Sequence, residues 1–219
     1  MTDALAAVLF DMDGLLVDTE PLWLETETEV MGRLGARWTP EDQETLLGGS
    51  MERTVSYLLA KAARPAPARD IERWMIDGML DRVRAGRVVV RPGARELVAA
   101  VAAAGVPCAL VTSSQRSFTD AVLDAVGLPF AVTVCGEDVT ATKPAPEPYL
   151  LGAKLLNVDP VRSVALEDSP NGVTAAAAAG CGVVAVPSLV PIPPAPGRIV
   201  VLSLTDVSLE ILRELAARQ

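Results

Sequence analysis

The chain has 219 residues, half of them apolar and only 4% aromatic, which is enough to bury a large aliphatic core. The net charge of −9 and the pI near 4.6 exclude non-specific binding to nucleic acid or to an anionic membrane surface. There is no histidine, which excludes a Ser-His-Asp triad, a Cys-His pair and an HExxH zinc site.

Cysteine use and apolar runs indicate a soluble cytoplasmic protein. Cys108, Cys135 and Cys181 are odd in number and widely spaced, which is typical of reduced thiols rather than of a disulfide framework. The N-terminus lacks a basic region followed by an apolar stretch. The longest uncharged apolar run, 97–111, is interrupted by Gly105 and Pro107 and is too short to span a bilayer. We therefore expect no membrane partner.

The first predicted element is a buried strand over the apolar run Ala6–Phe10. Asp11 and Asp13 follow it one residue apart, and Gly14 lets the chain turn away. Because two carboxylates this close repel each other, the pair is expected to bind a hard divalent cation. One acid then serves as a nucleophile and the other as a proton carrier. The alternative is a solvated turn after a buried strand.

The next region, residues 20–86, reads as a small helical unit without strands. Its charged amphipathic segments are separated by Gly or Pro and cover Pro21–Leu34, Met51–Ala63 and Ala68–Ala85. Because this unit leaves the chain just after the first strand, we expect it to form a cap domain at residues 19–88. The remaining residues, 1–18 and 89–219, then form the core domain.

After Arg91 the pattern alternates between helix and strand. Pro92 is predicted to begin a helix that ends at Gly105. The later strands are expected at Val106–Thr112, Ala131–Cys135, Ser163–Glu167, Val183–Pro187 and Ile199–Leu202, and the helices at Phe118–Val126, Glu147–Leu156 and Pro170–Ala179. This alternation predicts an α/β fold with a doubly wound, Rossmann-like parallel sheet. The Pro-rich stretch 187–197 is predicted to be a loop before an edge strand.

Polar side chains follow four of the predicted strands. Besides Asp11 and Asp13, they are Thr112-Ser113-Ser114, Thr142-Lys143-Pro144 and Glu167-Asp168-Ser169. Because right-handed crossovers bring the carboxyl ends of all strands to one edge, we expect these groups to converge there. Each also has a structural explanation, as a helix cap, a solvated loop or a helix start. Four coincidences at equivalent strand ends favour a site.

Other motifs fit poorly. The stretch after Asp11 lacks the later acid and glycine of a calcium loop, and no Walker A sequence occurs. The stretch 180–185 matches a dinucleotide fingerprint only by its letters, because it precedes a predicted strand instead of following one.

The four segments together resemble, in order, the motifs of the haloacid dehalogenase-like (HAD) hydrolase superfamily. They are Asp11-Met12-Asp13-Gly14-Leu15-Leu16-Val17-Asp18-Thr19, Val111-Thr112-Ser113, Lys143-Pro144 and Glu167-Asp168-Ser169. The inserted helical segment is similar to the cap of the branch with β-phosphoglucomutase and the sugar-, polyol- and other small-metabolite phosphatases. The stretch from Asp18 to Trp23 is most similar to bacterial hexitol- and 2-deoxyglucose-phosphate phosphatases.

The resemblance implies a mechanism for hydrolysis of a phosphate ester. Asp11 attacks phosphorus and forms an aspartyl-phosphate, and Asp13 protonates the leaving oxygen and then activates water. A magnesium ion is held by Asp11, the backbone carbonyl of Asp13 and Asp168. Glu167 is either a ligand through water or an acid behind the ligands. Asp13 also separates phosphatases from dehalogenases and phosphonatases, which lack an acid at that position.

The resemblance also implies how the substrate is bound. Thr112, Ser113 and Lys143 bind the phosphoryl group, with the backbone amides of Met12, Asp13 and Ser113. The candidate residues on the substrate side are Glu20, Trp23, Gly48, Gly49, Arg53, Arg116 and Asn171. The expected partner is a small-molecule phosphate ester such as a sugar or polyol phosphate, and neither a nucleic acid nor an obligate protein partner is inferred.

Two alternatives to a phosphatase remain. A β-phosphoglucomutase-like mutase needs a histidine where Trp23 stands and two cations where Leu47 and Met51 stand, so this reading requires Arg53 to hold the second phosphate. The other alternative is an inactive relative with a binding or regulatory role, against which the intact Asp11, Asp13, Lys143 and Asp168 argue.

Overall fold

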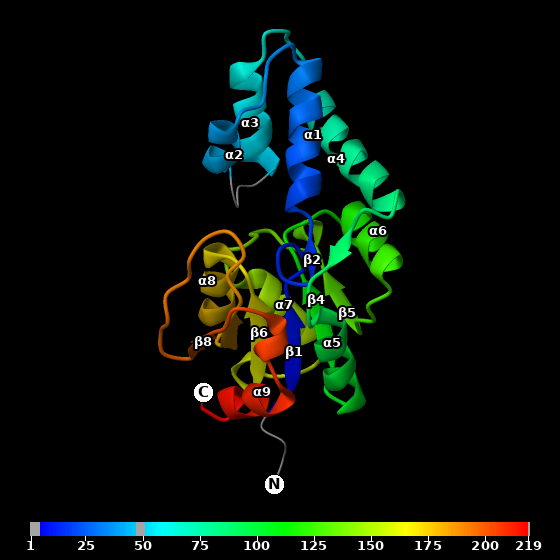
Figure 1. Cartoon of the computed structure of the whole chain (residues 1–219). Helices are drawn as coiled ribbons and strands as arrows, with labels where there is room; N and C mark the ends of the chain where they lie inside the picture. The colour runs from blue at the N-terminus through cyan, green and yellow to red at the C-terminus, as the bar shows by residue number, and fades with distance from the viewer. Residues whose placement is uncertain (1–4, 47–50, 219) are drawn as a thin grey trace. The chain divides into compact units, whose positions relative to one another are not determined.

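The computed structural model describes residues 5–46 and 51–218 of the chain (Figure 1). The chain divides into two compact units, one comprising residues 1–18 and 89–219 and the other residues 19–88. The first is an α/β unit and the second is helical. No helix within the described ranges is both long and apolar enough to cross a membrane.

A six-stranded parallel sheet forms the centre of the α/β unit, as the sequence predicted. The strand order is β5-β4-β1-β6-β7-β8. The strands are β1 (Ala7–Phe10), β4 (Cys108–Val111), β5 (Val132–Val134), β6 (Ser163–Glu167), β7 (Gly182–Ala185) and β8 (Arg198–Val200). Leu9 of β1 pairs with Ala109 of β4 and Ala165 of β6. The chain first builds the sheet outward from β1 through β4 to β5 and then returns to the other side of β1, which creates a topological switch point.

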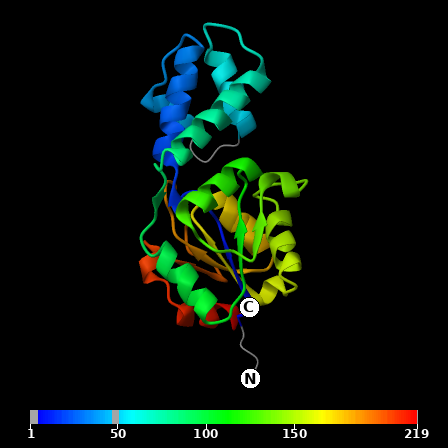
Figure 2. The same ribbon diagram turned by 90° about the vertical axis from the view of Figure 1, so that its right-hand side faces the viewer.

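Helices cover both faces of this sheet, which explains why β1, β4, β6 and β7 are buried along their whole length. Helices α5 (Ala94–Ala103) and α9 (Leu209–Ala216) pack together on one face, and α7 (Glu147–Leu155) and α8 (Pro170–Ala178) on the other (Figure 2). Helix α6 (Arg116–Val126) connects β4 to β5. Ala175 and Ala176 of α8 are fully buried, and their small side chains let the helix backbone approach the sheet.

Several element boundaries differ from the predictions by one or two residues, and the structure contains two helices and two short strands that were not predicted. Helix α5 begins at Ala94 rather than at Pro92, because Gly93 adopts a left-handed conformation with φ of 84° immediately before it. A Cβ at Gly93 would lie 2.5 Å from the backbone nitrogen of Thr205. The elements that sequence reasoning missed are α9, the helix α2 (Pro40–Leu46), and the antiparallel pair of β2 (Val17–Asp18) and β3 (Val89–Val90).

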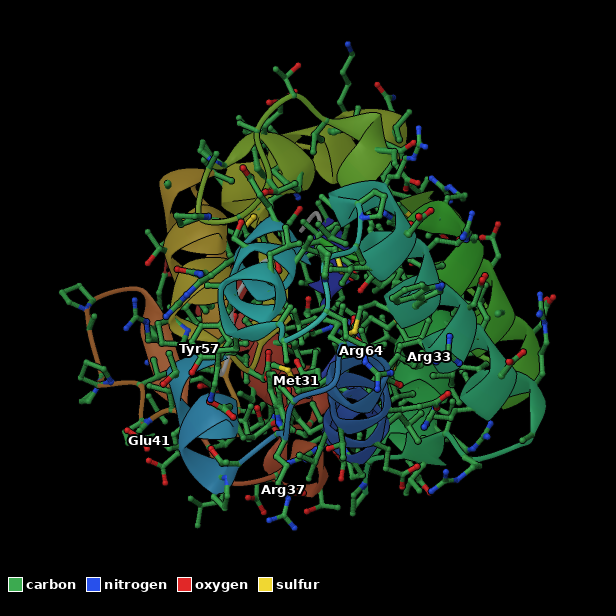
Figure 3. The ribbon with its side chains drawn as sticks, turned by 90° about the horizontal axis from the view of Figure 1, so that it is seen from above. Met31, Arg33, Arg37, Glu41, Tyr57 and Arg64 are labelled. Atoms are coloured by element: carbon green, nitrogen blue, oxygen red, sulfur yellow. The ribbon has the colours of Figure 1, made fainter. Side chains whose placement is uncertain are left out.

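The helical unit contains α1 (Glu20–Arg33), α2, α3 (Met51–Lys61) and α4 (Ala68–Arg84), with no strand in the described part of residues 19–88. Figure 3 shows Met31 within this bundle and Arg37 and Glu41 at its outer edge. The core of the unit consists of Val30, Met31, Leu34, Val55, Leu58, Ile71 and Met75. Helices α1 and α4 approach closely, since a Cβ at Gly78 would lie 2.8 Å from Cγ2 of Thr26.

A buried carboxylate links α2 to α3 within the helical unit. Asp42 is 1% exposed and accepts hydrogen bonds from the Tyr57 hydroxyl (2.6 Å), the Thr39 backbone N–H (2.8 Å) and the Lys61 ammonium. Burial alone would raise the pKa of Asp42, but the hydrogen bonds from Lys61 and Tyr57 lower it below its ordinary value. Asp42 therefore stays charged and stabilises the junction of the two helices.

Candidate active site

The groups at the strand ends of the α/β unit converge where its topology changes direction. Asp11 directly follows β1, Thr112 follows β4, and Glu167 and Asp168 stand at the end of β6. Because β1 lies between β4 and β6 in the sheet, these ends are neighbours. This edge of an open α/β sheet is the usual place for a ligand site.

Lys143, from the loop before α7, connects these strand ends. Its ammonium donates to Asp11 Oδ1 (2.5 Å), Glu167 Oε1 (2.6 Å) and the carbonyl oxygen of Val111 (2.8 Å). Its side chain is only 6% exposed. Burial alone would lower the pKa of Lys143, but the charges of Asp11 and Glu167 raise it above its ordinary value. Lys143 is therefore a fixed positive charge aimed at Asp11.

The site contains more negative charge than Lys143 can neutralise. Carboxylate oxygens of Asp11, Glu167 and Asp168 all lie within 4.8 Å of one another. Burial, and after it the negative charges of Glu167, Asp168 and Asp13, raises the pKa of Asp11 well above its ordinary range against the opposing effect of Lys143. Burial and the charge of Glu167 raise the pKa of Asp168 to about 7. This uncompensated set of oxygen donors fits a hard divalent cation.

Gly14 and Ser188 confine the carboxylate of Asp168. Gly14 has φ of 82°, and a Cβ there would lie 2.0 Å from Asp168 Oδ2. The hydroxyl of Ser188, from the loop after β7, donates to the same Oδ2 atom. Outer partners of this kind hold metal-ligating carboxylates in position.

Glu167 is enclosed on every side. Oε1 accepts from Lys143 and from the Tyr149 hydroxyl (2.5 Å), whereas Oε2 accepts from the Asp168 backbone N–H (3.2 Å) and the Ser169 hydroxyl (3.3 Å). A Cβ at Gly172 would lie 1.9 Å from the Glu167 carboxylate, so only a glycine fits at this position of α8. Burial raises the pKa of Tyr149 well above its ordinary value, which keeps its hydroxyl a donor. Because each oxygen of Glu167 already accepts two hydrogen bonds, this carboxylate is better suited to holding Lys143 than to binding a metal directly.

Asp13 has different surroundings from Asp11. Its Oδ2 accepts from the Ser114 hydroxyl (2.7 Å) and, at 3.5 Å, from the hydroxyl of Thr112. Thr112 Oγ1 accepts in turn from the Ser114 backbone N–H (3.0 Å). Asp13 is half-buried, whereas Asp11 is buried. Two neighbouring acids in unlike environments are suited to different roles.

The proposed substrate-side residues of the α/β unit lie apart from this cluster of contacts. Arg116, at the start of α6, donates to the Thr133 carbonyl oxygen (3.2 Å) and to Asp138, and its backbone N–H donates to Glu137 (2.6 Å). These bonds give Arg116 a structural role at the end of β5. Asn171 is exposed in the first turn of α8, and Ser113 is exposed after β4.

The other substrate-side candidates belong to the helical unit. Glu20 and Trp23 lie half-buried in the first turns of α1, and Trp23 packs against the core of that unit. Arg53 in α3 is exposed and donates to the carbonyl oxygen of Thr45 (2.7 Å). Gly48 and Gly49 lie outside the described residues.

Three residues around the site were missed in the sequence: Tyr149, Ser188 and Gly172. Ser114 was part of the polar segment 112–114 expected at the site, but its bond to Asp13 was not predicted. Ser188 stands in the Pro-rich stretch that we predicted to be a plain loop, and its bond to Asp168 depends on how that loop folds back. Tyr149 and Gly172 lie inside helices, where a tyrosine or a glycine carries no signal of the neighbour it meets in space.

A doubly wound α/β sheet with a buried cluster of acids and a lysine at its carboxyl edge is typical of an enzyme active site. Residues 8–186 match the family model described as haloacid dehalogenase-like hydrolase. The chain belongs to this family of hydrolases, as its motifs predicted.

Named relatives extend over most of the chain. It is 36% identical over 186 residues to "Protein CbbY" of Cereibacter sphaeroides, which covers 80% of each chain. It is 35% identical to "Hexitol phosphatase B" of Escherichia coli (strain K12) over 97% of this chain and 95% of that one. Among solved structures it is similar to CbbY from Rhodobacter sphaeroides in complex with xylulose-(1,5)bisphosphate, with a TM-score of 0.85, 30% identity and coverage of 95% and 99%.

Proposed function

We propose that this hydrolase is a magnesium-dependent phosphatase that releases phosphate from a small phosphorylated sugar or polyol. The observation that carries the proposal is the arrangement of Asp11. This buried carboxylate follows β1, receives the Lys143 ammonium at 2.5 Å and lies beside the carboxylate of Asp168. A nucleophile for phosphorus needs such an oriented anion with positive charge beside it.

The reaction has two displacements at phosphorus. In the first, the Asp11 carboxylate forms a bond to phosphorus while the bond to the ester oxygen breaks, and Asp13 gives its proton to the departing alcohol. In the second, Asp13 takes a proton from water, the water oxygen bonds to phosphorus, and the aspartyl-phosphate bond breaks. The products are the alcohol and inorganic phosphate, and both aspartates return to their first state.

Asp11, Asp168 and the backbone carbonyl of Asp13 would hold the magnesium ion. When bound, the ion supplies positive charge that offsets the repulsion between the attacking carboxylate and the phosphoryl oxygens. We propose that Glu167 supports these ligands without binding the ion, because each of its two oxygens already accepts two hydrogen bonds. Thr112, Ser113 and Lys143 are assigned to the phosphoryl group.

The relatives support the proposed substrate class. Hexitol phosphatase B is named for a polyol phosphate, and the CbbY structure contains a sugar bisphosphate. We propose that residues 19–88 act as the cap and that Glu20, Trp23, Gly48, Gly49 and Arg53 select the substrate. Arg116 and Asn171 complete the proposed set, although the bonds of Arg116 to Asp138 and Thr133 favour a structural role for it.

The test is release of inorganic phosphate, with and without magnesium, from a panel of sugar, polyol, nucleotide and short acid phosphates. Xylulose 1,5-bisphosphate and β-glucose 1-phosphate belong to the panel, the latter with a parallel assay for glucose 6-phosphate. We expect magnesium-dependent release from a few sugar or polyol phosphates. Formation of the isomer without release would replace the proposal with a mutase. Absence of any turnover would leave a binding or regulatory role.

Replacing Asp13 by Asn separates the two acids. The loss of general acid–base catalysis should slow turnover by about 10²–10⁴-fold. Esters with poor leaving groups should be affected most, because their departing oxygen depends on the proton. Equal losses for p-nitrophenyl phosphate and for an alkyl phosphate would contradict this role.

A further inference from the structure

Tyr149 contacts the candidate site through both its hydroxyl, which donates to Glu167, and its ring, which faces Lys143. It lies in the first turn of α7 and is fully buried. Its hydroxyl donates to Glu167 Oε1 at 2.5 Å. The Lys143 ammonium lies 5.1 Å from the centre of its ring, within reach of a cation–π interaction.

The contacts of Tyr149 and Lys143 meet on the same oxygen atom. Glu167 Oε1 accepts from Lys143 Nζ at 2.6 Å as well as from Tyr149. Lys143 also donates to Asp11 at 2.5 Å, so Asp11 and Glu167 compete for one ammonium. A second donor on Oε1 shares its negative charge and weakens its pull on Lys143. The hydrogen bond from the tyrosine hydroxyl therefore strengthens the interaction of the Lys143 ammonium with Asp11 relative to its interaction with Glu167.

The remaining contacts of Glu167 leave it little freedom to respond. Its Oε2 accepts from the Asp168 N–H and from Ser169, and Gly172 presses against the carboxylate from α8. The position of Oε1 is therefore set by Tyr149 on one side and Lys143 on the other.

We propose that Tyr149 is a positioning residue for the proposed phosphoryl transfer: it holds Glu167 and directs the Lys143 ammonium onto the nucleophile Asp11. The inference rests on the proposed function for its effect on turnover. Tyr149 itself touches no reacting atom and acts through Glu167 and Lys143. Its ring also packs in the core with Leu9, Val111 and Val134, so the test must separate positioning from packing.

The chain offers a matched control, because it contains two tyrosines and both donate to a carboxylate that also binds a lysine. Tyr57 donates to Asp42 at 2.6 Å, and Lys61 lies 5.6 Å from its ring. Tyr149→Phe and Tyr57→Phe therefore remove the same atom from the same kind of cluster. Both keep the ring and its packing.

In steady-state kinetics with saturating magnesium, Tyr149→Phe should lower kcat about tenfold or more and leave KM within about twofold. The loss should be the same for p-nitrophenyl phosphate and for an alkyl phosphate, because the change acts on the nucleophile and not on the leaving group. Tyr57→Phe should keep the kcat of the unmodified enzyme. A normal kcat for Tyr149→Phe, or an effect confined to KM, would overturn the proposal.

A second measurement needs no turnover. The chain has only three lysines, so ¹⁵N-lysine labelling gives three ammonium signals, which Lys61→Arg and Lys154→Arg variants assign by elimination. Tyr149→Phe should shift the Lys143 signal or speed its hydrogen exchange, and Tyr57→Phe should act on Lys61 instead. An unchanged Lys143 signal would overturn the positioning role even in an active variant. An unmodified enzyme that is inactive on every ester, with the Lys143 shift intact, would count against the proposed function alone.

Discussion

The two units of this protein each contain a buried carboxylate that binds one lysine and one tyrosine. In the helical unit the carboxylate is Asp42, with Lys61 and Tyr57. In the α/β unit it is Glu167, with Lys143 and Tyr149. The side-chain chemistry is the same, and in both cases the ammonium lies over the face of the tyrosine ring.

The two clusters differ in their balance of charge. Lys61 compensates a single acid, and the pKa of Asp42 is lowered even though burial opposes this. Lys143 faces Asp11, Glu167 and Asp168 together, and the pKa of Asp11 and of Asp168 is raised, by burial first and by neighbouring acids second. Charge balance is typical of a structural junction. A surplus of buried negative charge is unfavourable for folding and indicates a site that binds a cation or carries out chemistry.

The largest expected effect comes from removing the proposed nucleophile. Asp11→Asn should abolish turnover, with a loss of at least about four orders of magnitude in kcat. Asp42→Asn, the matching change in the balanced cluster, should reduce stability and leave the chemical step intact. Rates from a phosphate-release assay and melting temperatures from circular dichroism distinguish these outcomes. Appreciable activity in Asp11→Asn would mean that the nucleophile is another residue.

Removing each lysine tests the charge balance directly. Lys143→Met leaves Asp11 and Glu167 without their cation and should destabilise the fold by about 3–5 kcal/mol. Lys61→Met should have a smaller effect, because Lys61 is 37% exposed and Asp42 keeps its bonds to Tyr57 and Thr39. Urea unfolding at pH 7 without divalent metal measures both. Equal losses of unfolding free energy in the two variants would show that the two clusters do not differ in charge balance.

Two glycine substitutions test how tightly the site is enclosed. Gly172→Ala places a methyl group 1.9 Å from the Glu167 carboxylate and should cost up to about 3 kcal/mol together with activity. Gly32→Ala, in the exposed part of α1, meets nothing within 4 Å and should stabilise the helical unit by about 0.5–1 kcal/mol. If Gly172→Ala unfolds at the same urea concentration as the unmodified protein and is as active, the carboxylate is not confined by α8.

One buried acid of the helical unit, Glu27, has no cation paired with it among the described ion pairs. Glu27 in α1 is buried, and its Oε2 has no hydrogen-bond partner among the described residues. Burial, followed by the charge of Glu20, raises its pKa from 4.5 to about 7. The folded state therefore favours the protonated form of Glu27. The contribution of this group to the free energy of unfolding should be fully present below about pH 4.5 and be lost as the pH rises through about 7.

Glu27→Gln should therefore be the more stable protein at pH 8, by on the order of 2 kcal/mol, and the advantage should vanish toward pH 4.5. Glu29→Gln on the same helix is the control with the opposite sign. The pKa of Glu29 is lowered by its bonds to Arg33 and Arg82, so its small contribution is present at neutral pH and lost in acid. Melting temperatures between pH 4.5 and 8 measure both changes. A pH dependence that persists unchanged in Glu27→Gln would rule out Glu27 as its source.

The fold could be predicted well because its signals are local. Continuous apolar runs between turn residues indicated the central strands, and β6 begins and ends where the sequence placed it. Helices α2 and α9 were missed because segments of seven or eight residues contain too few turns for a periodic pattern. The pair β2–β3 was missed because each strand has two residues and the partners are more than 70 positions apart.

The sequence by itself determined the family to which this protein belongs. The absence of histidine, the acids after the first and fourth strands of the parallel alternation, and the order of four motifs led to a haloacid dehalogenase-like hydrolase. These features are determined locally, by residue type and by position at a strand end. Only the tertiary structure decided which groups surround each acid: that Glu167 holds Lys143 rather than standing open, and that Tyr149, Ser188 and Gly172 belong to the site. Such contacts depend on how helices and loops pack against the strand ends. The spacing of residues along the chain does not show which of these distant residues come into contact.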